Sequence, residues 1–400
     1  MISMIKHITD PYGDRNVFSR LSVVFSIINR IINLLLFPIF KILKIKLLKS
    51  PFEAIGHQIY DMECFFYEKN KNNYDFTPLI LESPKFISNP FLLSKQKEKF
   101  KFFTVKNKFI CTILYYQKKF DNVCFNTDPY LATRKNAKAY SILKKTDFKI
   151  NFSENDIRYC KKILKEKKIK LEEKLVILHV RDDTYKPFDG ESYRSSNIEN
   201  YKLTIKWLKD IGYQIIRIGN KGMVKCSFEN LLIDTTQNSF GYCDPILDFY
   251  FTSKSRFFIS TCSGPEKIAK VFDKPVVSID MAPLAASLPL SKKCIALPKL
   301  VKNTKNEKIL SFHDLINYNF ADLRLDRDFK KNNLTCISNT SEEILEAVKE
   351  LHEKIINNDF ELNEMQKKFN NLFHKDSYCY GAEATISSSF INKYKHLLIE

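Results

Sequence analysis

Short apolar runs alternate with amphipathic segments between residues 174 and 280. Five strands are predicted there by the runs KLVILHV, QIIRIGN, NLLIDT, RFFIS and KPVVSID, and helices by the segments that begin SSNIENY, DPILDFY and TCSGPEK. Strands that are apolar at consecutive positions and joined by helices are typical of a parallel sheet covered on both faces. This half of the chain is therefore predicted to be a doubly wound α/β domain.

A second α/β domain is indicated between residues 50 and 150. A helix is predicted by IGHQIYDMECFFYEKN, and strands by TPLILES and FICTILYY. A charged helix over 153–174 would carry the chain from one domain to the other. After residue 300, an Asn/Lys-rich connection precedes SEEILEAVKELHEKII, an amphipathic helix that Ser341 would cap.

The segment 17–49 is apolar apart from a narrow stripe of polar residues. These recur at steps of three and four, which predicts a helix with one polar edge. The stripe consists of Ser19, Ser22, Ser26, Asn29, Arg30 and Asn33. Three placements are open: in the plane of a membrane with the stripe toward the headgroups, docked on the protein's own surface, or spanning the bilayer.

The in-plane placement is favoured by the charges in this segment. Four lysines in its last part would each gain about 1 kcal/mol near anionic lipid; they are Lys41, Lys44, Lys46 and Lys49. A spanning helix would instead put Arg30 near the bilayer centre, at a cost of about 2.5–3.5 kcal/mol on insertion scales. The preceding residues include Asp10 and Asp14 and no small-residue cleavage site, so we expect no cleaved leader.

The charge balance adds one constraint. A net charge of +18 and a pI near 9.2 favour an anionic partner, which could be nucleic acid, a membrane surface or a phosphorylated substrate. Part of the excess is lysine in a chain also rich in Asn and Ile, a bias that an AT-rich genome alone produces. The ten cysteines show no C-x-x-C and no paired Cys/His spacing, so neither a zinc site nor a disulfide framework is indicated.

Polar residues collect where the predicted strands end. They are His179, Arg181 and Asp182 after the first strand, Arg217 and Gly219 at the second, and Thr261, Ser263 and Gly264 after the fourth. Ligands of an open parallel sheet bind beyond the carboxyl ends of its strands, so these residues predict a binding crevice. STCSGPEK places hydroxyls and a glycine at a helix start, where free N–H groups favour a phosphate. Arg181 would add a permanent positive charge for a diphosphate.

Structural roles remain open at the same positions. The alternatives are a backbone-bonded histidine at 179, an ion pair between Arg181 and the adjoining aspartates, and a plain helix start at 263–264. Three residues of the following loop are as consistent with a helix cap as with a ligand site; they are Tyr193, Arg194 and Asn197. No G-x-G-x-x-G or G-x-x-x-x-G-K-[ST] is present, which disfavours a dehydrogenase and a P-loop enzyme.

These motifs carry a resemblance to a known family. LHVRDDTY, YRSSNIENY, GYQIIRIGN and FFISTCSGPEKIA, in this order, resemble a bacterial family of glycosyltransferases from surface-polysaccharide gene clusters. The match covers most of residues 50–400, since IGHQIYDMECFFYEK and ISSSFINKYKHLL resemble the family's ends. The HVR strand end is also similar to that of fucosyltransferases of the GT-B class, in which the arginine binds the sugar-nucleotide diphosphate. Those enzymes often have two basic residues where this chain has Arg181 followed by two aspartates.

The resemblance implies two facing Rossmann-like domains, a nucleotide-sugar substrate, no required metal or other cofactor, and diphosphate binding by Arg181. Transfer of a sugar to a hydroxyl usually needs a base. The acceptor side would belong to the first domain, where the segment IGHQIYDME offers His57, Asp61 and Glu63. Of these, His57 titrates near neutrality, but either acid remains plausible.

We accordingly divide the chain into four parts. They are a membrane-associating amphipathic helix (1–49), an acceptor domain (50–152), a nucleotide-sugar-binding domain (153–340) and C-terminal helices that pack back across the domains (341–400). The chain is expected to be a GT-B glycosyltransferase, peripheral on the cytoplasmic face of the membrane, acting on a glycan or lipid-linked glycan, with no nucleic-acid partner. The alternatives are a catalytically idle scaffold of a polysaccharide assembly complex and a basic nucleic-acid-binding protein.

Overall fold

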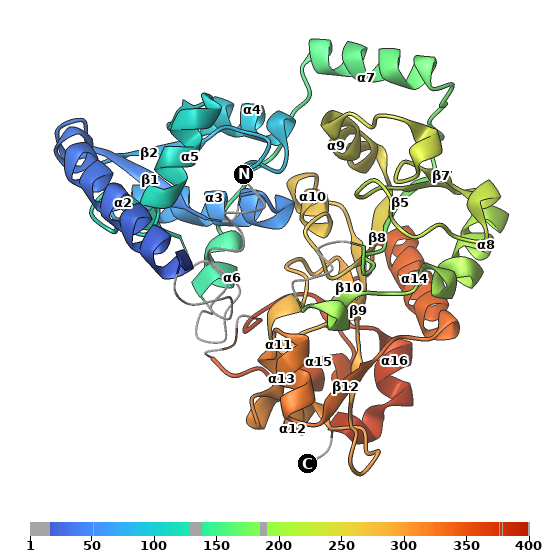
Figure 1. The fold of residues 1–400 in the computed structure, drawn as a ribbon. Helices are drawn as coiled ribbons and strands as arrows, with labels where there is room; N and C mark the ends of the chain where they lie inside the picture. Colours follow the sequence, from blue (N-terminus) through green and yellow to red (C-terminus); the bar gives the residue numbers. More distant parts are fainter. Residues whose placement is uncertain are drawn as a thin grey trace.

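The computed structural model describes residues 17–50, 52–127, 138–184, 190–375, 377 and 379–398. They form two α/β domains, each built on its own parallel sheet, with α7 (Glu154–Glu166) on the connection between them (Figure 1). Two such sheets with helices on their faces are the GT-B-like architecture expected from the sequence. An apolar helix, α2 (Val17–Ile42), precedes the first sheet.

The N-terminal sheet has four parallel strands in the order β3-β2-β1-β4. They are β1 (Ile45–Lys49), β2 (Thr77–Leu81), β3 (Phe103–Val105) and β4 (Cys124–Asn126). Its helices are α2, α3 (Ile55–Lys71), α4 (Pro90–Lys99), α5 (Lys108–Gln117) and α6 (Lys138–Leu143). Adjacent residues of β1 enter different cores, because Leu47 packs with residues of α2 and α5 and Leu48 with residues of α3. The sheet is therefore covered on both faces.

The C-terminal sheet has seven strands in the order β13-β10-β9-β8-β5-β6-β7, and every pairing is parallel. They are β5 (Leu175–His179), β6 (Gln214–Arg217), β7 (Ile233–Asp234), β8 (Phe257–Thr261), β9 (Val276–Met281), β10 (Cys294–Pro298) and β13 (Thr385–Ile386). Every residue of β5, β8 and β9 is buried, as their continuous apolar runs predict. Strand order reverses between β5 and β8, which is where ligands bind in such sheets.

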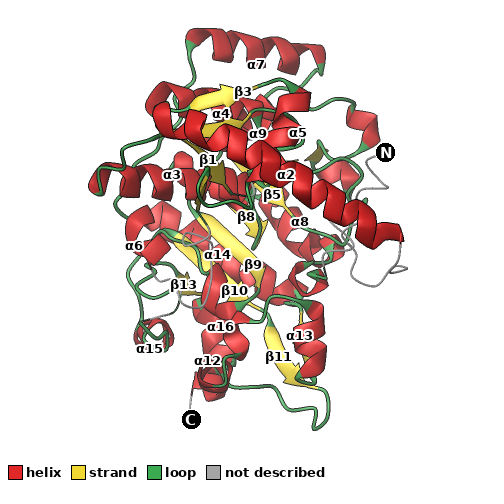
Figure 2. Ribbon diagram, turned by 60° about the vertical axis from the view of Figure 1, so that its left-hand side comes forward, coloured by secondary structure: helices red, strands yellow, loops and turns green. Residues whose placement is uncertain are grey.

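Helices cover both faces of this sheet (Figures 1 and 2). Two of them, α9 (Pro245–Lys254) and α10 (Glu266–Val271), face the N-terminal domain and contact α4 and α3 respectively. On the other face α14 (Ser341–Asn357) packs against α8 (Lys202–Asp210), β9 and β10. The remaining elements lie at the far end of the domain: α11 (Leu284–Ser287), α12 (Phe312–Asn317), α13 (Asp326–Lys331), α15 (Glu364–Asn370), α16 (Ser388–Lys393) and the antiparallel pair β11 (Leu300–Asn303) and β12 (Leu334–Ile337).

Two predicted elements are wrong. FICTILYY was expected to be a strand but belongs to α5, where Asn107 accepts hydrogen bonds from the first N–H groups and only one face, including Cys111 and Leu114, is buried. The helix expected over 17–49 ends at Ile42, and the residues after it form β1, which lies inside the sheet. The boundary expected at residue 49 therefore falls after a strand of the N-terminal domain.

The C-terminal segment lies mainly on its own domain. Strand β13 extends the C-terminal sheet beside β10, and α14 packs within that domain. Glu383 reaches the N-terminal part through an ion pair with Lys144 (3.4 Å). The linking helix α7 is shorter than expected, because it ends at Glu166 and Lys168 takes a left-handed conformation (φ 54°).

Candidate functional site

The predicted crevice lies at the carboxyl ends of β5 and β8, which are paired neighbours. Just beyond the paired region, the backbone N–H of Arg181 donates to Oγ1 of Thr261 (2.9 Å), and this bond holds the two strand ends together. Thr261 is fully buried and makes a structural contact there. The chain leaves the sheet with Arg181 on one strand and Ser263 on the other, at the position where strand order reverses.

Two arginines share one carboxylate at this edge. Nη2 of Arg181 lies 3.2 Å from Oε2 of Glu191, and Nη1 of Arg194 lies 2.8 Å from the same oxygen. Arg194 also donates from Nη2 to the carbonyl oxygen of Cys262 (3.0 Å), which ties it to the end of β8. Two guanidinium groups therefore lie side by side on one carboxylate, and guanidinium groups are strong hydrogen-bond donors to carboxylates and phosphates.

Buried polar atoms without partners adjoin this cluster. Neither Oγ of Ser263 nor Nε of Arg194 has a hydrogen-bond partner among the residues that the structure describes. A buried polar group left unsatisfied costs about 1–3 kcal/mol, and such groups in a native protein are often completed by a ligand. Gly264 and Pro265 follow, and then α10, which has only six residues.

Two glycines bring the N-terminal domain against this edge. A Cβ added to Gly264 would lie 2.8 Å from Cγ2 of Ile55 and 3.1 Å from the backbone N of Gly56, and one added to Gly56 would lie 3.1 Å from Cα of Gly264. Side chains at both positions would force the backbones apart. Since Gly56 stands in the first turn of α3, the contact places the start of α3 beside the strand ends.

His57 follows Gly56 and faces the cluster across the domain boundary. Its Nδ1 lies 3.1 Å from Oδ2 of the buried Asp61, which also accepts a hydrogen bond from Oγ of Ser50 (2.6 Å). The side chain of His57 is 38% exposed, so Nε2 can be approached by a substrate. Burial lowers the pKa of His57 and the charge of Arg194 lowers it further, but the hydrogen bond and the nearby carboxylates outweigh both, so its pKa is raised.

Glu63 does not face the crevice. It is buried between α3 and α10, in an ion pair with Lys270 and a hydrogen bond from Oγ1 of Thr146 (2.6 Å). A carboxylate that is 1% exposed and paired in this way cannot take a proton from a substrate in the crevice, and its expected role as a base is at odds with this position. Asp61 is engaged with His57 and Ser50, so His57 is the best placed of the three candidate bases.

Three other predicted ligand residues make structural contacts. Arg217 is fully buried; its Nη1 donates to Oδ2 of Asp234 (3.0 Å) and to the carbonyl oxygen of Val224 (2.8 Å), while its Nε and Nη2 have no partner among the described residues. Asp182 accepts from the backbone N–H groups of Thr184 (3.0 Å) and Val224 (2.6 Å). Gly219 is required by its φ of 152° and by Met223, whose Sδ would lie 2.4 Å from an added Cβ. These residues shape the loops around the crevice.

His179 is also held by the fold. Its Nδ1 lies 3.0 Å from the carbonyl oxygen of Ile218, and only 5% of the residue is exposed. Burial lowers the pKa of His179 to about 4, and the charges of Arg217 and Arg181 act in the same direction. The side chain is therefore neutral at physiological pH and joins the ends of β5 and β6.

The predicted loop residues separate into different roles. The Tyr193 ring packs against Phe329, with ring centroids 4.9 Å apart, and its backbone N–H donates to Asp326. The exposed Asn197 caps a short 3-10 helix by accepting from the N–H of Glu199 (3.0 Å). Only Arg194 joins the charged cluster.

Sequence reasoning missed the residues that hold this loop. Glu191 was not singled out, although both arginines bind it. Asp280 accepts hydrogen bonds from Oγ of Ser196 and from the N–H of Asn339 (2.7 Å), and Ser196 donates from its own N–H to the carbonyl oxygen of Arg181 (2.9 Å). No local pattern marks Asp280, because its partners Ser196 and Asn339 lie 84 and 59 positions away along the chain.

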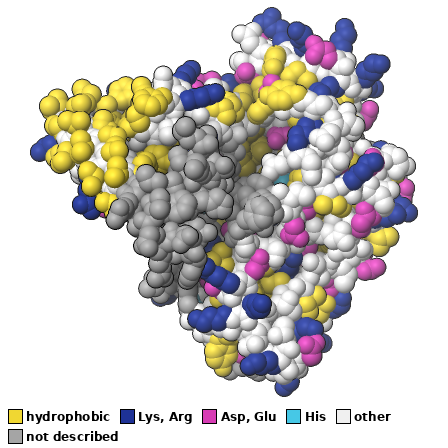
Figure 3. All heavy atoms as spheres, in the orientation of Figure 1, with side chains coloured by type: hydrophobic (Ala, Val, Ile, Leu, Met, Phe, Trp, Pro, Cys, Tyr) yellow, Lys and Arg dark blue, Asp and Glu magenta, His cyan; other side chains and the backbone are white. Residues whose placement is uncertain are grey.

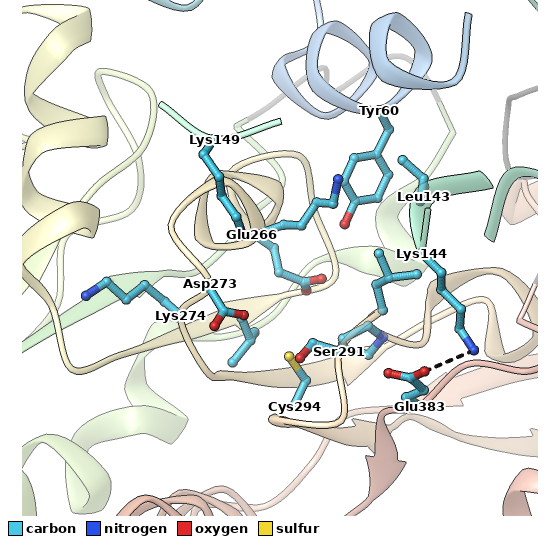
Figure 4. Close-up of a pocket in the computed structure, with 14 residues that line it drawn as sticks. Tyr60, Leu143, Lys144, Lys149, Glu266, Asp273, Lys274, Ser291, Cys294 and Glu383 are labelled. Atoms are coloured by element: carbon cyan, nitrogen blue, oxygen red, sulfur yellow. Dashed lines mark ion pairs between the residues drawn. The ribbon is translucent and has the colours of Figure 1, made fainter. Parts of the chain in front are cut away.

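A separate pocket of about 200 Å³ lies near the amino ends of β9 and β10 (Figure 4). Its lining includes Tyr60, Glu266 and Lys270, and it is crossed at one side by the ion pair between Lys144 and Glu383. The charged groups at its centre are already paired, Glu266 with Lys267 and with Oγ of Ser278. The pocket is at the opposite end of the strands from the arginine cluster, and we assign no chemistry to it.

Within the described residues no group of three or more His, Cys, Asp or Glu side chains could hold a metal ion. The ten cysteines form no disulfide in this structure. Independence from metals remains a prediction. So does the resemblance to fucosyltransferases in the HVR segment, although the structure supplies a second basic residue, Arg194, beside Arg181.

No protein-family model and no curated protein matches the chain. Among solved structures it is similar to the ADP-heptose LPS heptosyltransferase II of E. coli (12% identity over 64% of this chain and 90% of that chain, TM-score 0.41). It is also similar to a family 9 glycosyltransferase of Veillonella parvula (12% identity, 78% and 97% covered, TM-score 0.43). The iron-containing dodecameric glycosyltransferase TibC of enterotoxigenic E. coli gives 13% identity, 78% and 76% coverage and a TM-score of 0.41. Overlaps at this level carry no argument about function.

Proposed function

We propose that the protein is a glycosyltransferase that moves a sugar from a nucleotide-sugar donor to a hydroxyl of a glycan acceptor. The observation that carries this proposal is the pair of arginines on Glu191, which lies where strand order reverses and is faced by His57 from the other domain. A positive site at the ends of parallel strands suits a diphosphate, and a histidine opposite it suits an acceptor hydroxyl.

The arginine cluster would bind the donor's diphosphate. Both guanidinium groups converge there, and Ser263 offers a buried hydroxyl without a partner among the described residues. When the bond between the sugar and the terminal phosphate breaks, negative charge grows on the leaving nucleoside diphosphate. Guanidinium groups held in place by Glu191 and the Cys262 carbonyl would stabilise that charge without reorganising.

His57 would act as the base. The acceptor oxygen attacks the anomeric carbon, the nucleoside diphosphate leaves, and the hydroxyl proton passes to Nε2 of His57 and then to solvent. Asp61, on Nδ1, would fix the tautomer in which Nε2 accepts a proton and would stabilise the charged ring afterwards. The proposal makes Asp61 a positioning residue and gives no chemical role to Glu63.

The finer parts of the proposal concern the substrates. We propose a hexose or deoxyhexose as the sugar, a lipid-linked surface glycan as the acceptor, and no metal, because the arginine pair supplies the charge that a departing diphosphate requires.

A thermal-shift screen tests the donor site. The full-length protein would be heated with GDP, UDP, CMP, ADP and dTDP and with their common sugar conjugates. A nucleotide at 100 times its dissociation constant should stabilise the folded state by about 2.7 kcal/mol. The Arg181→Ala protein should lose that response, whereas Arg256→Ala, which removes an exposed arginine, should keep it. A folded wild-type protein that responds to none of the nucleotides would contradict the proposal and favour a scaffold or a nucleic-acid-binding protein.

A further inference from the structure

Helix α2 carries an unusual share of the exposed apolar side chains. Of the 24 large hydrophobic residues exposed in the described part of the chain, twelve lie between residues 23 and 43. They are Val23, Val24, Phe25, Ile27, Ile28, Ile31, Leu34, Leu35, Phe37, Ile39, Ile42 and Leu43. Figure 3 shows them as a continuous apolar surface over α2. We call this surface the α2 face.

Two residues of the polar stripe of α2, Asn29 and Asn33, point toward the protein, whereas Arg30 is exposed. Asn33 and Asn122 exchange two side-chain hydrogen bonds (3.2 and 2.9 Å), and Nε2 of Gln117 donates to Oδ1 of Asn29 (3.2 Å). Asn29 and Asn33 are buried, as is Phe40 further along the same side. The expected orientation, with the stripe toward lipid headgroups, is therefore wrong, because these amides find their partners on the N-terminal domain.

The apolar surface extends onto α5, which lies beside α2 (Figure 2). The rings of Phe25 and Tyr116 meet edge to face at 4.8 Å and join the two helices. At the start of α5, Phe109 is 74% exposed and Ile110 is also exposed. A folded soluble domain rarely exposes apolar patches of this extent, so the surface indicates a partner.

The two segments that carry this surface are mainly basic, although two of their lysines are paired with acids, Lys44 with Asp75 (2.5 Å) and Lys106 with Glu82 (3.6 Å). Residues 17–52 contain six Lys or Arg and no Asp or Glu, and residues 99–120 contain another six and again no acid. Arg30 and Lys41 are eleven residues apart, three helical turns, so they lie along the same edge of α2, and both are exposed. Long basic side chains at the edge of an apolar face can reach lipid headgroups while the face itself is immersed.

We propose that the α2 face, with Phe109 and Ile110, inserts into the surface of an anionic lipid bilayer with α2 parallel to the membrane plane. Basic edges match anionic headgroups, whereas in a symmetric dimer the same basic edges would face each other. Helix α2 is long and apolar enough to cross a membrane over Ser22–Ile42. Crossing would, however, break the Asn33–Asn122 pair and put Arg30 in the hydrocarbon core.

Vesicle flotation of the full-length protein tests the proposal. The wild-type protein should float with phosphatidylglycerol vesicles and much less with phosphatidylcholine vesicles, and added salt should weaken its binding. Leu34→Glu should lower binding about tenfold or more, because it puts a charge where the face enters lipid. Ile356→Glu is the matched control, since Ile356 on α14 is 67% exposed and Leu34 is 71% exposed. Equal binding by both variants, or none by the wild type, would overturn the proposal.

Two further measurements distinguish the in-plane lipid contact from a dimer and from a membrane-spanning helix. Sedimentation equilibrium without lipid detects a dimer. If the wild type dimerises but does not bind vesicles, and Leu34→Glu abolishes the dimer, the partner of the α2 face is a second copy of the chain and not lipid. To measure how deeply the face enters the bilayer, Leu34→Trp is introduced in a Trp207→Phe background. The fluorescence of the new tryptophan should be quenched by lipids brominated near the headgroups. Strongest quenching from the bilayer centre would mean a spanning helix and contradict the in-plane placement. Leu34→Glu should keep the nucleotide thermal shift, so this proposal and the proposed function can fail separately.

Discussion

The pairing of Glu63 with Lys270 across the two domains leads to a quantitative prediction. The Glu63 side chain is 1% exposed and that of Lys270 is 18% exposed, so replacing Lys270 by methionine would leave a carboxylate buried with only Thr146 as a donor. Loss of one partner of a buried ion pair costs about 3–5 kcal/mol. Since Lys270 is partly hydrated, we expect Lys270→Met to lower the free energy of unfolding by about 3 kcal/mol, near the lower end of that range.

The double variant Glu63→Gln/Lys270→Met should recover most of this loss, because it removes the unpaired charge. The measurement is a urea titration at pH 7, followed by far-UV circular dichroism, of the wild type, both single variants and the double variant. As a control, Lys162→Met breaks an exposed pair with Glu166 and should change stability by less than about 0.5 kcal/mol.

A double variant no more stable than Lys270→Met would refute the reasoning that the cost comes from an uncompensated Glu63. The same proteins test the chemistry as well. Glu63→Gln should retain sugar transfer from whichever donor the thermal-shift screen identifies. If a folded Glu63→Gln protein loses transfer, Glu63 returns as the candidate base.

Two further predictions concern histidines in and beside the crevice. His57→Gln should slow sugar transfer by about 100-fold or more. In the wild type the rate should rise with pH through the raised pKa of His57, above 6.5, and His57→Gln should remove this rise. Radiolabelled transfer measured against pH checks this, and an unchanged profile would argue against a base at this position. His179 has a pKa of about 4 in the folded protein, so as pH falls from 6.5 toward 4 the unfolded chain binds a proton that the folded one does not. Stability present above pH 6.5 should fall by about 3 kcal/mol over that window, and a His179→Asn protein should lose this part of the pH dependence in urea titrations; equal slopes would contradict it.

The sequence determined the elements that are buried on both sides. Strands β5, β8 and β9 are apolar at consecutive positions, as expected of strands that are covered on both faces, and this pattern can be recognised from the sequence of each strand alone. It also predicted a site at the strand ends, where the structure places Arg181 just after β5 and Ser263 just after β8; the function of these residues stays a prediction.

Prediction from the hydrophobic pattern failed where the same pattern fits both a strand and a helix. FICTILYY is apolar enough for a strand, yet it forms a helix of which only one face is buried. Strand β1 was hidden in a run that continues the apolar character of α2 after Ile42. The contact of Gly56 with Gly264 joins residues of the two domains, and residue spacing along the chain does not indicate it.

The amphipathic helix shows the division most plainly. The spacing of polar residues at three and four positions was enough to predict one polar edge and a broad apolar surface on α2, because the helical period places such residues on one side. Packing against the N-terminal domain turns Asn29 and Asn33 toward Gln117 and Asn122 and leaves the apolar surface outside. A hydrophobic pattern states which side chains share a face, and what that face meets depends on the rest of the fold.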